Sequence, residues 1–269
     1  EAAMAHGATD TLEQDDTAKD WFDQNSPGTG PYILTKWEPN AEVIYEANKN
    51  WWGGTPPLSR FIVKHVEDPT LAVQMLQTGG VDLIPWLDFD LINTVKADSN
   101  LSISASDDII TYYLAMNMDP EISELSANKL IRQAVAAAID KDEIIETIFQ
   151  GYASRAPTII SAGMLGVKTE DAQPRDVELA RSLLAEAGYE NGIDIDLYYF
   201  STPPEWSMVA TVIQSDLAEV GINVELKPTE PSVLRSELGA GSIPFALASW
   251  GPDTPDPTQL TDIDRKSVV

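Results

Sequence analysis

The chain contains no cysteine, which excludes disulfide bonds, thiolate catalysis and cysteine-bound metal sites. It has only two histidines, His6 and His65, and neither belongs to a His/Asp/Glu pattern with the spacing of a zinc or di-iron site. No apolar run approaches the roughly 20 residues that a membrane-spanning helix needs. Residues 1–30 do not show the basic, apolar and small-residue order of a signal peptide. The sequence therefore predicts no metal site and no other cofactor.

Positive charge is also scarce. Seventeen basic side chains stand against 43 acidic ones, which gives a formal net charge of −26. A nucleic-acid backbone or an anionic membrane surface would be repelled, so neither is expected as a partner. The 43% of hydrophobic residues is ample for a packed core. The composition is that of a globular protein with an acidic surface.

The common catalytic motifs are missing as well. Gly28 and Gly30 precede an expected strand, whereas phosphate-binding loops need a strand before the glycines and a helix after them. No Gly-x-Ser-x-Gly motif occurs, and two histidines make a Ser-His-Asp triad improbable. A carboxylate pair, Asp253 with Asp256, is the one glycosidase-like arrangement left open. Such enzymes usually draw their two acids from different elements, so no catalytic residue is predicted and the chain is not expected to be an enzyme.

The first part of the chain has a mixed pattern of strands and helices. The expected elements are a hairpin at 32–45 that turns at 38–40, a strand at 61–66, a helix from Pro69 to Gly79, a strand at 81–84 and a helix at 90–97. The strand, helix and strand between 61 and 84 are predicted to form a crossover unit. The chain then runs extended through residues 109–118, which include Tyr112, Tyr113 and Asn117.

The second part reads as an α/β domain. A helix with an apolar stripe begins near Ser126, and Asp140 with Glu143 is typical of the start of the next helix. The segments LLAEAG and DLAEVG then each end a helix with a glycine and precede a strand of alternating apolar residues. The pattern predicts a parallel βαβ unit from a strand at 193–200, a helix at 206–220 and a strand at 222–227. A helix at 232–238 and a strand from Phe245 complete this part.

The segment FALASWGPDTPDP, residues 245–257, is the leading candidate for a binding site. Its strand stops at Gly251 and Pro252, which leaves Trp250 and Asp253 at the end of a sheet, where α/β folds place their ligands. The competing interpretation is an ordinary Asp/Pro loop after a strand. Trp206 also lies beside a proline-containing loop, and an aromatic face near a carboxylate can hold a cation or stack on a ligand.

Several segments together carry a resemblance to a known family. They are GTGPYILTKWEPN at 28–40, NKNWWGGTPPLSRFIVKHVED at 48–68, AVQMLQTGGVDLIP at 72–85, IRQAVAAAIDKDEIIETIFQGYASRAP at 131–157, the two glycine-ended helices, and FALASWGPDTPDP. In this order they resemble the extracytoplasmic solute-binding proteins of ABC importers, family 5, which bind peptides, nickel or oligosaccharides (cluster C). No single segment is decisive, but their ordered succession is specific.

The resemblance implies an α/β fold of the periplasmic-binding-protein type II kind, with two lobes, hinge-crossing strands and a ligand cleft between the lobes. Members of the family are nearly twice as long. The resemblance therefore implies that this chain is a fragment, in which the two-lobe fold is incomplete. The implied organisation is lobe I at 1–108, a hinge strand at 109–118, lobe II at 119–243, a second hinge strand at 244–251 and a return to lobe I at 252–269.

The resemblance also implies a function and a site. The protein is expected to capture a small solute outside the cytoplasm. A peptide is the leading ligand class, and an oligosaccharide or a metal chelate is the alternative. It would deliver the solute to an ABC permease from the periplasm or the outer face of the membrane, as a monomer. In peptide-binding relatives the acid matching Asp253 pairs with the α-amino group, and the tryptophan matching Trp250 lines a side-chain pocket. The expected ligand-binding residues are Trp250, Asp253, Tyr112, Tyr113, Asn117 and Trp206, and chemosensing and glycoside hydrolysis are the alternative functions.

Overall fold

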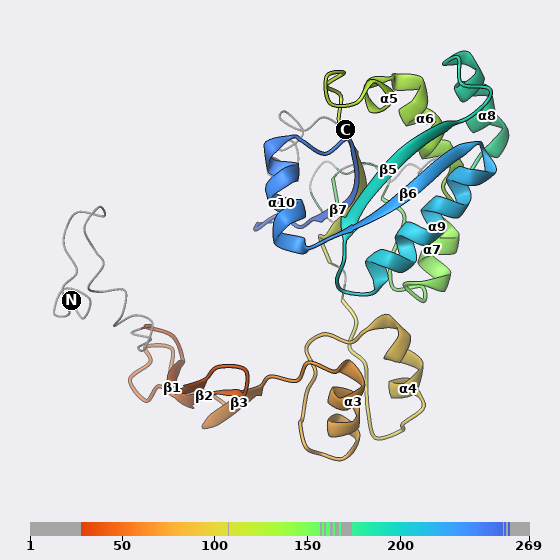
Figure 1. The fold of residues 1–269 in the computed structure, drawn as a ribbon. Coiled ribbons are helices and arrows are strands. Elements are labelled where there is room, and N and C mark those ends of the chain that lie inside the picture. Colours follow the sequence, from red (N-terminus) through yellow and green to blue (C-terminus); the bar gives the residue numbers. More distant parts are fainter. Residues whose placement is uncertain are drawn as a thin grey trace, which may run out of the picture. The chain divides into compact units, whose positions relative to one another are not determined.

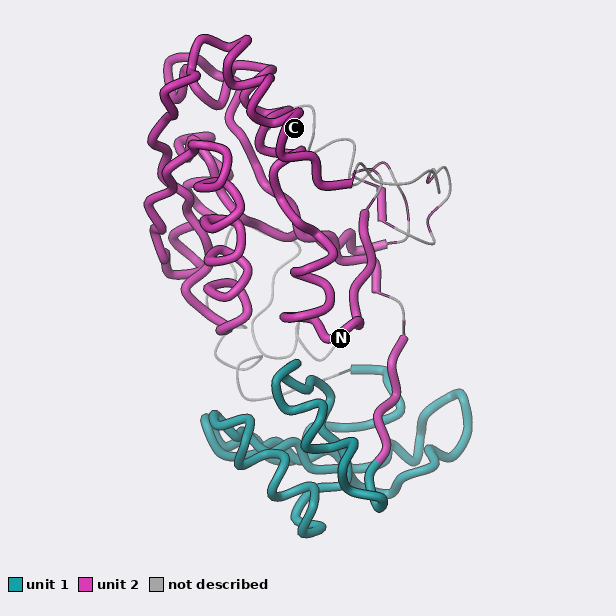
Figure 2. The backbone as a smooth tube through the Cα atoms, turned by 90° about the vertical axis from the view of Figure 1, so that its right-hand side faces the viewer, with its two compact units in different colours: residues 1–101 teal, residues 102–269 magenta. Residues whose placement is uncertain are grey.

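A computed structural model describes most of the chain. The described residues are 28–106, 108–156, 158, 160, 161, 164, 167, 174–254, 256 and 258. The chain divides into two compact units, Glu1–Leu101 and Ser102–Val269 (Figure 2). The lobe boundaries implied by the family resemblance stay predictions. Residues 1–27 and most of residues 252–269, which the resemblance assigns to the first lobe, lie outside the described residues.

The described part of unit 1 contains a three-stranded antiparallel sheet in the order β1-β2-β3 (Figure 1). The strands are β1 (Tyr32–Glu38), β2 (Glu42–Ala47) and β3 (Arg60–Lys64). The predicted hairpin is confirmed, and its turn places Asn40 at a φ of 58°. Aromatic rings hold the sheet together, because Phe61 stacks on Tyr45 at 4.7 Å and meets the edge of Tyr32 at 4.8 Å between ring centroids.

In the described part of unit 1, helices follow the sheet, and this region corrects one prediction. Helix α3 (Pro69–Gln77) begins where the Asp68 carboxylate accepts the N–H groups of Thr70 and Leu71, and a 3₁₀ turn (Phe89–Leu91) leads into α4 (Ile92–Lys96). The predicted strand at 81–84 does not form, so the crossover unit of strand, helix and strand was wrong. Instead, the N–H of Val81 donates to the carbonyl oxygen of Met75, which continues the turn after α3.

Unit 2 is built on a four-stranded sheet in the order β4-β7-β5-β6 (Figure 1). Its strands are β4 (Thr111–Met116), β5 (Ile193–Phe200), β6 (Ile222–Thr229) and β7 (Phe245–Trp250). Strand β5 pairs in parallel with both β6 and β7, whereas β4 runs antiparallel to β7. Helix α9 (Glu205–Glu219) connects β5 to β6 and packs on both. The predicted parallel βαβ unit is therefore confirmed.

In the described part of unit 2 the other helical segments include α5 (Glu124–Ala127), α6 (Lys129–Ala138), α7 (Lys141–Thr147), α8 (Val177–Glu186) and α10 (Pro231–Ala240). The predicted stripe on α6 is buried, with Ile131, Ala134 and Ala138 fully shielded from solvent, and α6 packs against α8. The predicted start of α7 is also present, because the Asp140 carboxylate accepts the N–H groups of Asp142 and Glu143. None of the helices in the described residues is both long and apolar enough to span a membrane.

Two glycines let the starts of β5 and β6 approach closely. Gly192 has a φ of +91° and Gly221 a φ of +92°, a backbone region that favours glycine. The N–H of Ile193 donates to the carbonyl oxygen of Gly221 at 3.0 Å. A Cβ atom on Gly192 would lie only 2.6 Å from that same oxygen.

We expect Gly192→Ala to lower the free energy of unfolding by at least about 2 kcal/mol, because it adds steric overlap to an unfavourable φ. The matched control is Gly241→Ala at the end of α10, where φ is +70° but no atom lies within 4 Å of the added Cβ. This control is expected to cost about 1 kcal/mol. Urea unfolding of both variants measures the difference, and equal losses would contradict the steric explanation.

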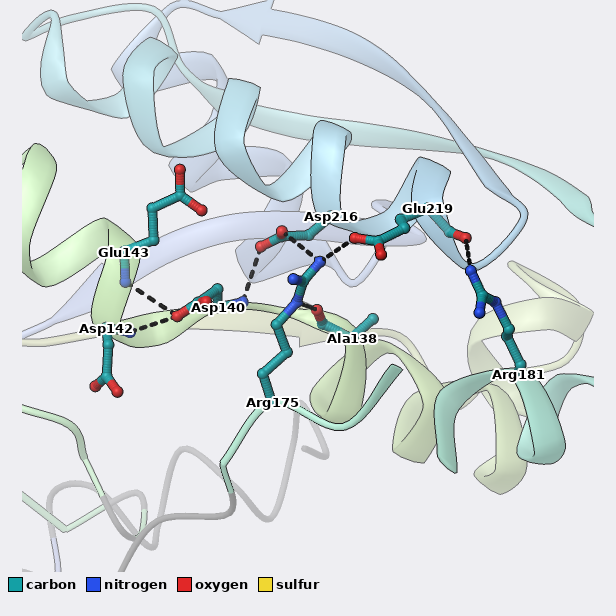
Figure 3. A network of polar contacts seen from close by, with 8 residues as sticks. All are labelled: Ala138, Asp140, Asp142, Glu143, Arg175, Arg181, Asp216 and Glu219. Carbon is teal, nitrogen blue, oxygen red and sulfur yellow. Dashed lines mark hydrogen bonds and ion pairs between the residues drawn. The ribbon is translucent and has the colours of Figure 1, made fainter. Parts of the chain in front are cut away.

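A polar network centred on Arg175 joins the helices that cover the sheet (Figure 3). The Arg175 guanidinium contacts Asp216 at 2.9 Å and Glu219 at 2.6 Å, both on α9. Its Nε donates to the carbonyl oxygen of Ala138 at the end of α6, at 2.8 Å. The second carboxylate oxygen of Asp216 accepts the backbone N–H of Asp140 at 2.8 Å. The segment before α8, the α6–α7 junction and α9 are thus tied together through one buried carboxylate.

Burial of the Asp216 carboxylate costs free energy, and the contacts with Arg175 and Asp140 offset this cost. The residue is 5% exposed, and burial raises the pKa of its carboxyl group, while the Asp140 N–H and the Arg175 guanidinium act in the opposite direction. A buried polar group of this kind is stable only when its hydrogen-bonding capacity is filled. The network is therefore a structural feature of unit 2.

Candidate functional site

The carboxyl edge of the unit 2 sheet is the main candidate for a ligand site. The parallel strands β5, β6 and β7 end there at Phe200, Thr229 and Trp250. Thr111, the first residue of β4, joins the same edge because it pairs with Trp250. Open α/β sheets bind ligands beyond the carboxyl ends of their strands. Most of the side chains predicted from the sequence fall at this edge.

The pleat of the sheet divides these side chains between two faces. Neighbouring residues of a strand point to opposite faces, and directly paired residues share a face. Thr111 pairs with Trp250 and Tyr112 with Ser249, so Tyr113 shares a face with Trp250, whereas Tyr112 lies on the other. The Trp250 side chain is 41% exposed. Tyr113 is half-buried, and burial raises the pKa of its phenol.

On the other face, Tyr112 belongs to an aromatic cluster. Its ring centroid lies 4.8 Å from that of Trp206, in the first turn of α9, and 5.4 Å from that of Phe149. Trp206 is a core residue, only 5% exposed, whereas Tyr112 is 39% exposed. Of the two, Tyr112 is therefore the side chain that a ligand would meet.

The Tyr112 hydroxyl stays protonated far above neutral pH. Burial raises its pKa to about 12, and the negative charges of Glu205 and Asp108 contribute to the increase. The neutral phenol is a hydrogen-bond donor and acceptor on an aromatic surface.

This pKa leads to a pH dependence of stability. A folded-state pKa above the ordinary value of 10.0 means that the contribution of Tyr112 is constant below about pH 10 and is lost as the pH rises towards about 12. We therefore expect the free energy of unfolding of the wild type to fall relative to that of Tyr112→Phe as the pH rises over this range. Urea unfolding of both proteins at about pH 8 and about pH 11 tests this. A difference that does not change with pH would refute the shifted pKa.

Asn117 lies away from the other predicted residues, at the far end of β4. Six residue steps separate it from Thr111, the pair partner of Trp250, which is about 20 Å along an extended strand. Its side-chain amide donates to the carbonyl oxygens of Gly241 at 2.7 Å and Ile243 at 3.3 Å, and its backbone N–H donates to Pro244 at 2.9 Å. Asn117 thus fixes the entry of the chain into β7, which is a structural role.

The loop after β7 places its two acids in different environments. Asp253 is exposed, and within the described residues its carboxylate makes no hydrogen bond or ion pair. Asp256 accepts the backbone N–H and the hydroxyl of Thr258 at 2.9 and 2.8 Å, and these bonds lower the pKa of its carboxyl group. Asp256 is therefore a loop-forming residue, and Asp253 is the acid that is available to a ligand.

One contributor to the site could not be found from the sequence. The buried Ser161 donates its hydroxyl proton to the carbonyl oxygen of Ile109 at 2.6 Å and lies 2.8 Å from the Thr111 hydroxyl. These bonds hold the start of β4 beside Trp250. Ser161 lies in a loop about fifty residues from its partners, and no local sequence pattern marks it.

Other parts of the described chain are weaker candidates for a ligand site. An open hollow in unit 1 is lined in part by Glu38, His65, Asp68 and Met75, and it contains none of the side chains predicted to bind ligand. Among the residues with described positions, no three His, Cys, Asp or Glu side chains are grouped so that they could hold a metal ion. The carboxyl edge of the unit 2 sheet is the best-supported candidate site.

Comparison with known proteins identifies relatives along nearly the whole chain. The profile described as "Bacterial extracellular solute-binding proteins, family 5 Middle" matches residues 2–267. Heme-binding protein A of Haemophilus influenzae is 28% identical over 241 residues, which are 88% of this chain and 44% of that protein. The chain spans about half the length of the relatives that it matches.

Solved structures agree on the fold. A periplasmic binding protein DppA from Helicobacter pylori, in complex with the peptide STSA, matches with a TM-score of 0.75 and 25% identity over 88% of this chain and 45% of its own. NikA from Brucella suis, in complex with Fe(III)-EDTA, matches with a TM-score of 0.78 and 26% identity over 88% of this chain and 51% of its own. The two-lobe binding-protein fold predicted from the sequence is therefore confirmed, and it is incomplete in this chain.

Proposed function

The chain belongs to the bacterial extracellular solute-binding proteins of family 5, and on this basis we propose that the protein is the solute-binding receptor of an ABC importer. The observation that carries the proposal is the carboxyl edge of the unit 2 sheet, where the exposed Trp250 is followed closely by the available carboxylate of Asp253. An aromatic face and a free carboxylate are suited to hold a small solute that has an apolar part and a cationic part. Solute binding would stabilise a closed state of the receptor.

A peptide is the ligand class that these residues favour. An α-amino group would supply the Asp253 carboxylate with the cation that it needs in a site closed from water. The Trp250 and Tyr113 rings, on the same face, offer apolar surface for a peptide side chain. The peptide complex of the Helicobacter pylori relative supports this ligand class. A metal chelate and an oligosaccharide remain the alternatives.

We propose binding without catalysis. A carboxylate-based glycosidase needs two acids on either side of the bond that is cleaved. Asp256 is engaged with Thr258, which leaves Asp253 as the only available acid of the predicted pair. Chemosensing would use the same binding step with a different membrane partner.

The expected setting follows from the family. The receptor would work in the periplasm or at the outer face of the cytoplasmic membrane and would pass its solute to the permease subunits. We propose that it acts as a monomer, because one receptor encloses one solute. The net charge of −26 makes a nucleic-acid partner unfavourable.

Thermal unfolding of the full-length protein with four ligand classes tests this function. The ligands are a pool of tri- and tetrapeptides, maltotriose, a nickel–histidine chelate and heme. At a concentration of one hundred times Kd, a ligand adds about 2.7 kcal/mol of stability, so we expect the peptide pool to raise Tm by several degrees. Peptides recovered afterwards should be chemically unchanged. Stabilisation by another class alone would reassign the ligand, and no stabilisation by any class would overturn the proposal.

A further inference from the structure

Two hydroxyl groups fix the start of β4. Ser161, in the segment between α7 and α8, is 3% exposed, and its hydroxyl donates to the carbonyl oxygen of Ile109 at 2.6 Å. The hydroxyl oxygens of Ser161 and Thr111 lie 2.8 Å apart. A hydroxyl has one proton, and that of Ser161 is bonded to Ile109, so the Thr111 hydroxyl donates to Ser161. The three groups therefore form one chain of hydrogen bonds from Thr111 through Ser161 to Ile109.

The segment that carries Ser161 is anchored on both sides of this residue. The Thr158 hydroxyl oxygen accepts the N–H of Ile160 at 3.1 Å, which shapes the turn before Ser161. The carbonyl oxygen of Ser161 accepts the N–H of Met164 at 3.3 Å, and Met164 is only 4% exposed. Ser161 therefore reaches β4 from a segment that has its own hydrogen bonds and a buried side chain.

The start of β4 also lies against the end of β7, where the candidate site is. Thr111 pairs with Trp250, the last residue of β7. The next residue, Gly251, gives room to Ile110, because a Cβ atom on Gly251 would lie only 2.9 Å from Ile110 Cγ1. Strand β4 is at the edge of the described sheet and has β7 as its one neighbour there. The bonds from Ser161 therefore supply a second attachment for the strand that lies beside Trp250.

We propose that Ser161 and Thr111 are positioning residues for ligand binding. The inference rests on the proposed function and deepens it: both side chains act through Trp250 and not by contact with the solute. An aromatic side chain that is already held in its binding position loses less freedom when the ligand arrives. Without the Ser161 hydroxyl, the Ile109 carbonyl and the Thr111 hydroxyl lose their partner. The affinity then falls with the fraction of molecules that keep the binding geometry.

Isothermal titration of the full-length protein with a peptide from the pool, at a temperature where the variants are folded, tests the positioning role. Ser161→Ala should weaken binding about tenfold, the loss expected when about a tenth of the molecules keep the binding geometry. Thr111→Val removes the other hydroxyl at nearly constant shape and should weaken binding about threefold, whereas Thr111→Ser keeps the hydroxyl and should stay within about twofold of the wild type. The matched control is Ser126→Ala, which removes a fully buried hydroxyl that accepts from Ser123 in α5 and should also stay within about twofold.

A spectroscopic signal separates positioning from stability. The protein is labelled with fluorinated tryptophan, and the fluorine NMR signal of Trp250 is assigned by its absence from Trp250→Phe. In the unliganded protein, Ser161→Ala should shift or broaden this signal, because the strand beside Trp250 is no longer fixed. Ser126→Ala removes a buried hydroxyl elsewhere in unit 2 and should leave the signal unchanged.

The possible failures are distinguishable. Wild-type affinity or an unchanged Trp250 signal in Ser161→Ala would overturn the positioning role and leave the receptor function intact. An equal loss of affinity in Ser126→Ala would assign the effect to stability and would also overturn it. If Ser161→Ala does not fold, the two Thr111 variants decide, and equal affinities of Thr111→Val and Thr111→Ser would refute the role of the hydroxyl. If the wild type binds no peptide from the pool, the peptide function itself fails and this inference fails with it.

Discussion

Replacing Asp216 with alanine is expected to lower the free energy of unfolding by about 3 kcal/mol. The substitution leaves the Arg175 guanidinium without its buried partner and the backbone N–H of Asp140 without an acceptor. Breaking one side of a buried ion pair typically costs about 3–5 kcal/mol. The lower end applies here, because the Arg175 side chain is 26% exposed and keeps its contacts with Glu219 and Ala138.

The control for this variant is Glu178→Gln, which breaks the ion pair between Glu178 and Arg181 on the surface of α8. Both side chains of that pair are exposed, and such pairs contribute about 0–1 kcal/mol. Urea unfolding of both variants, with an unchanged m-value, provides the comparison. If Asp216→Ala lost no more stability than Glu178→Gln, the network in Figure 3 would not be the structural centre of unit 2.

Asp253→Asn is expected to weaken peptide binding about 100-fold. Removing one charge from a desolvated, hydrogen-bonded ion pair costs about 2–5 kcal/mol, and the lower half of that range corresponds to this factor. The stability of the unliganded protein should change little, because Asp253 is exposed and makes no bond among the described residues. Isothermal titration of the full-length protein with a peptide from the pool measures the loss.

Two controls make this result specific. Asp256→Asn removes the same charge three residues away, where the carboxylate binds Thr258, so it should change the affinity by less than about threefold. A peptide with an acetylated amino terminus should bind the wild type and Asp253→Asn equally. If that peptide lost as much affinity as the free peptide on substitution of Asp253, the assigned pairing with the α-amino group would be wrong.

Sequence alone was sufficient for the elements that are specified locally. The alternating apolar residues of β5 and β6, each preceded by a helix that ends in glycine, indicated the parallel βαβ unit. Asp140 with Glu143 marked the start of α7. The prediction of a strand at 81–84 was wrong because a short apolar run does not form a strand without a partner strand. Leu83 in this segment is 73% exposed.

The strand that carries the candidate site was predictable from the sequence, but the arrangement of its side chains was not. Gly251 and Pro252 indicated where β7 ends and hence where Trp250 lies. The division of Tyr112 and Tyr113 between two faces depends on the register of β4 against β7, which follows only from the pairing. Likewise, nothing local shows that Asp216 is buried, since its partners Arg175 and Asp140 are 41 and 76 residues away in the sequence.

Native mass spectrometry of the full-length protein tests the central claim most directly. The protein is mixed with a pool of tripeptides, and the complexes are then isolated and dissociated. The account predicts one chemically unchanged peptide for each protein molecule. Protein without any retained peptide, or peptides released as cleavage products, would contradict it.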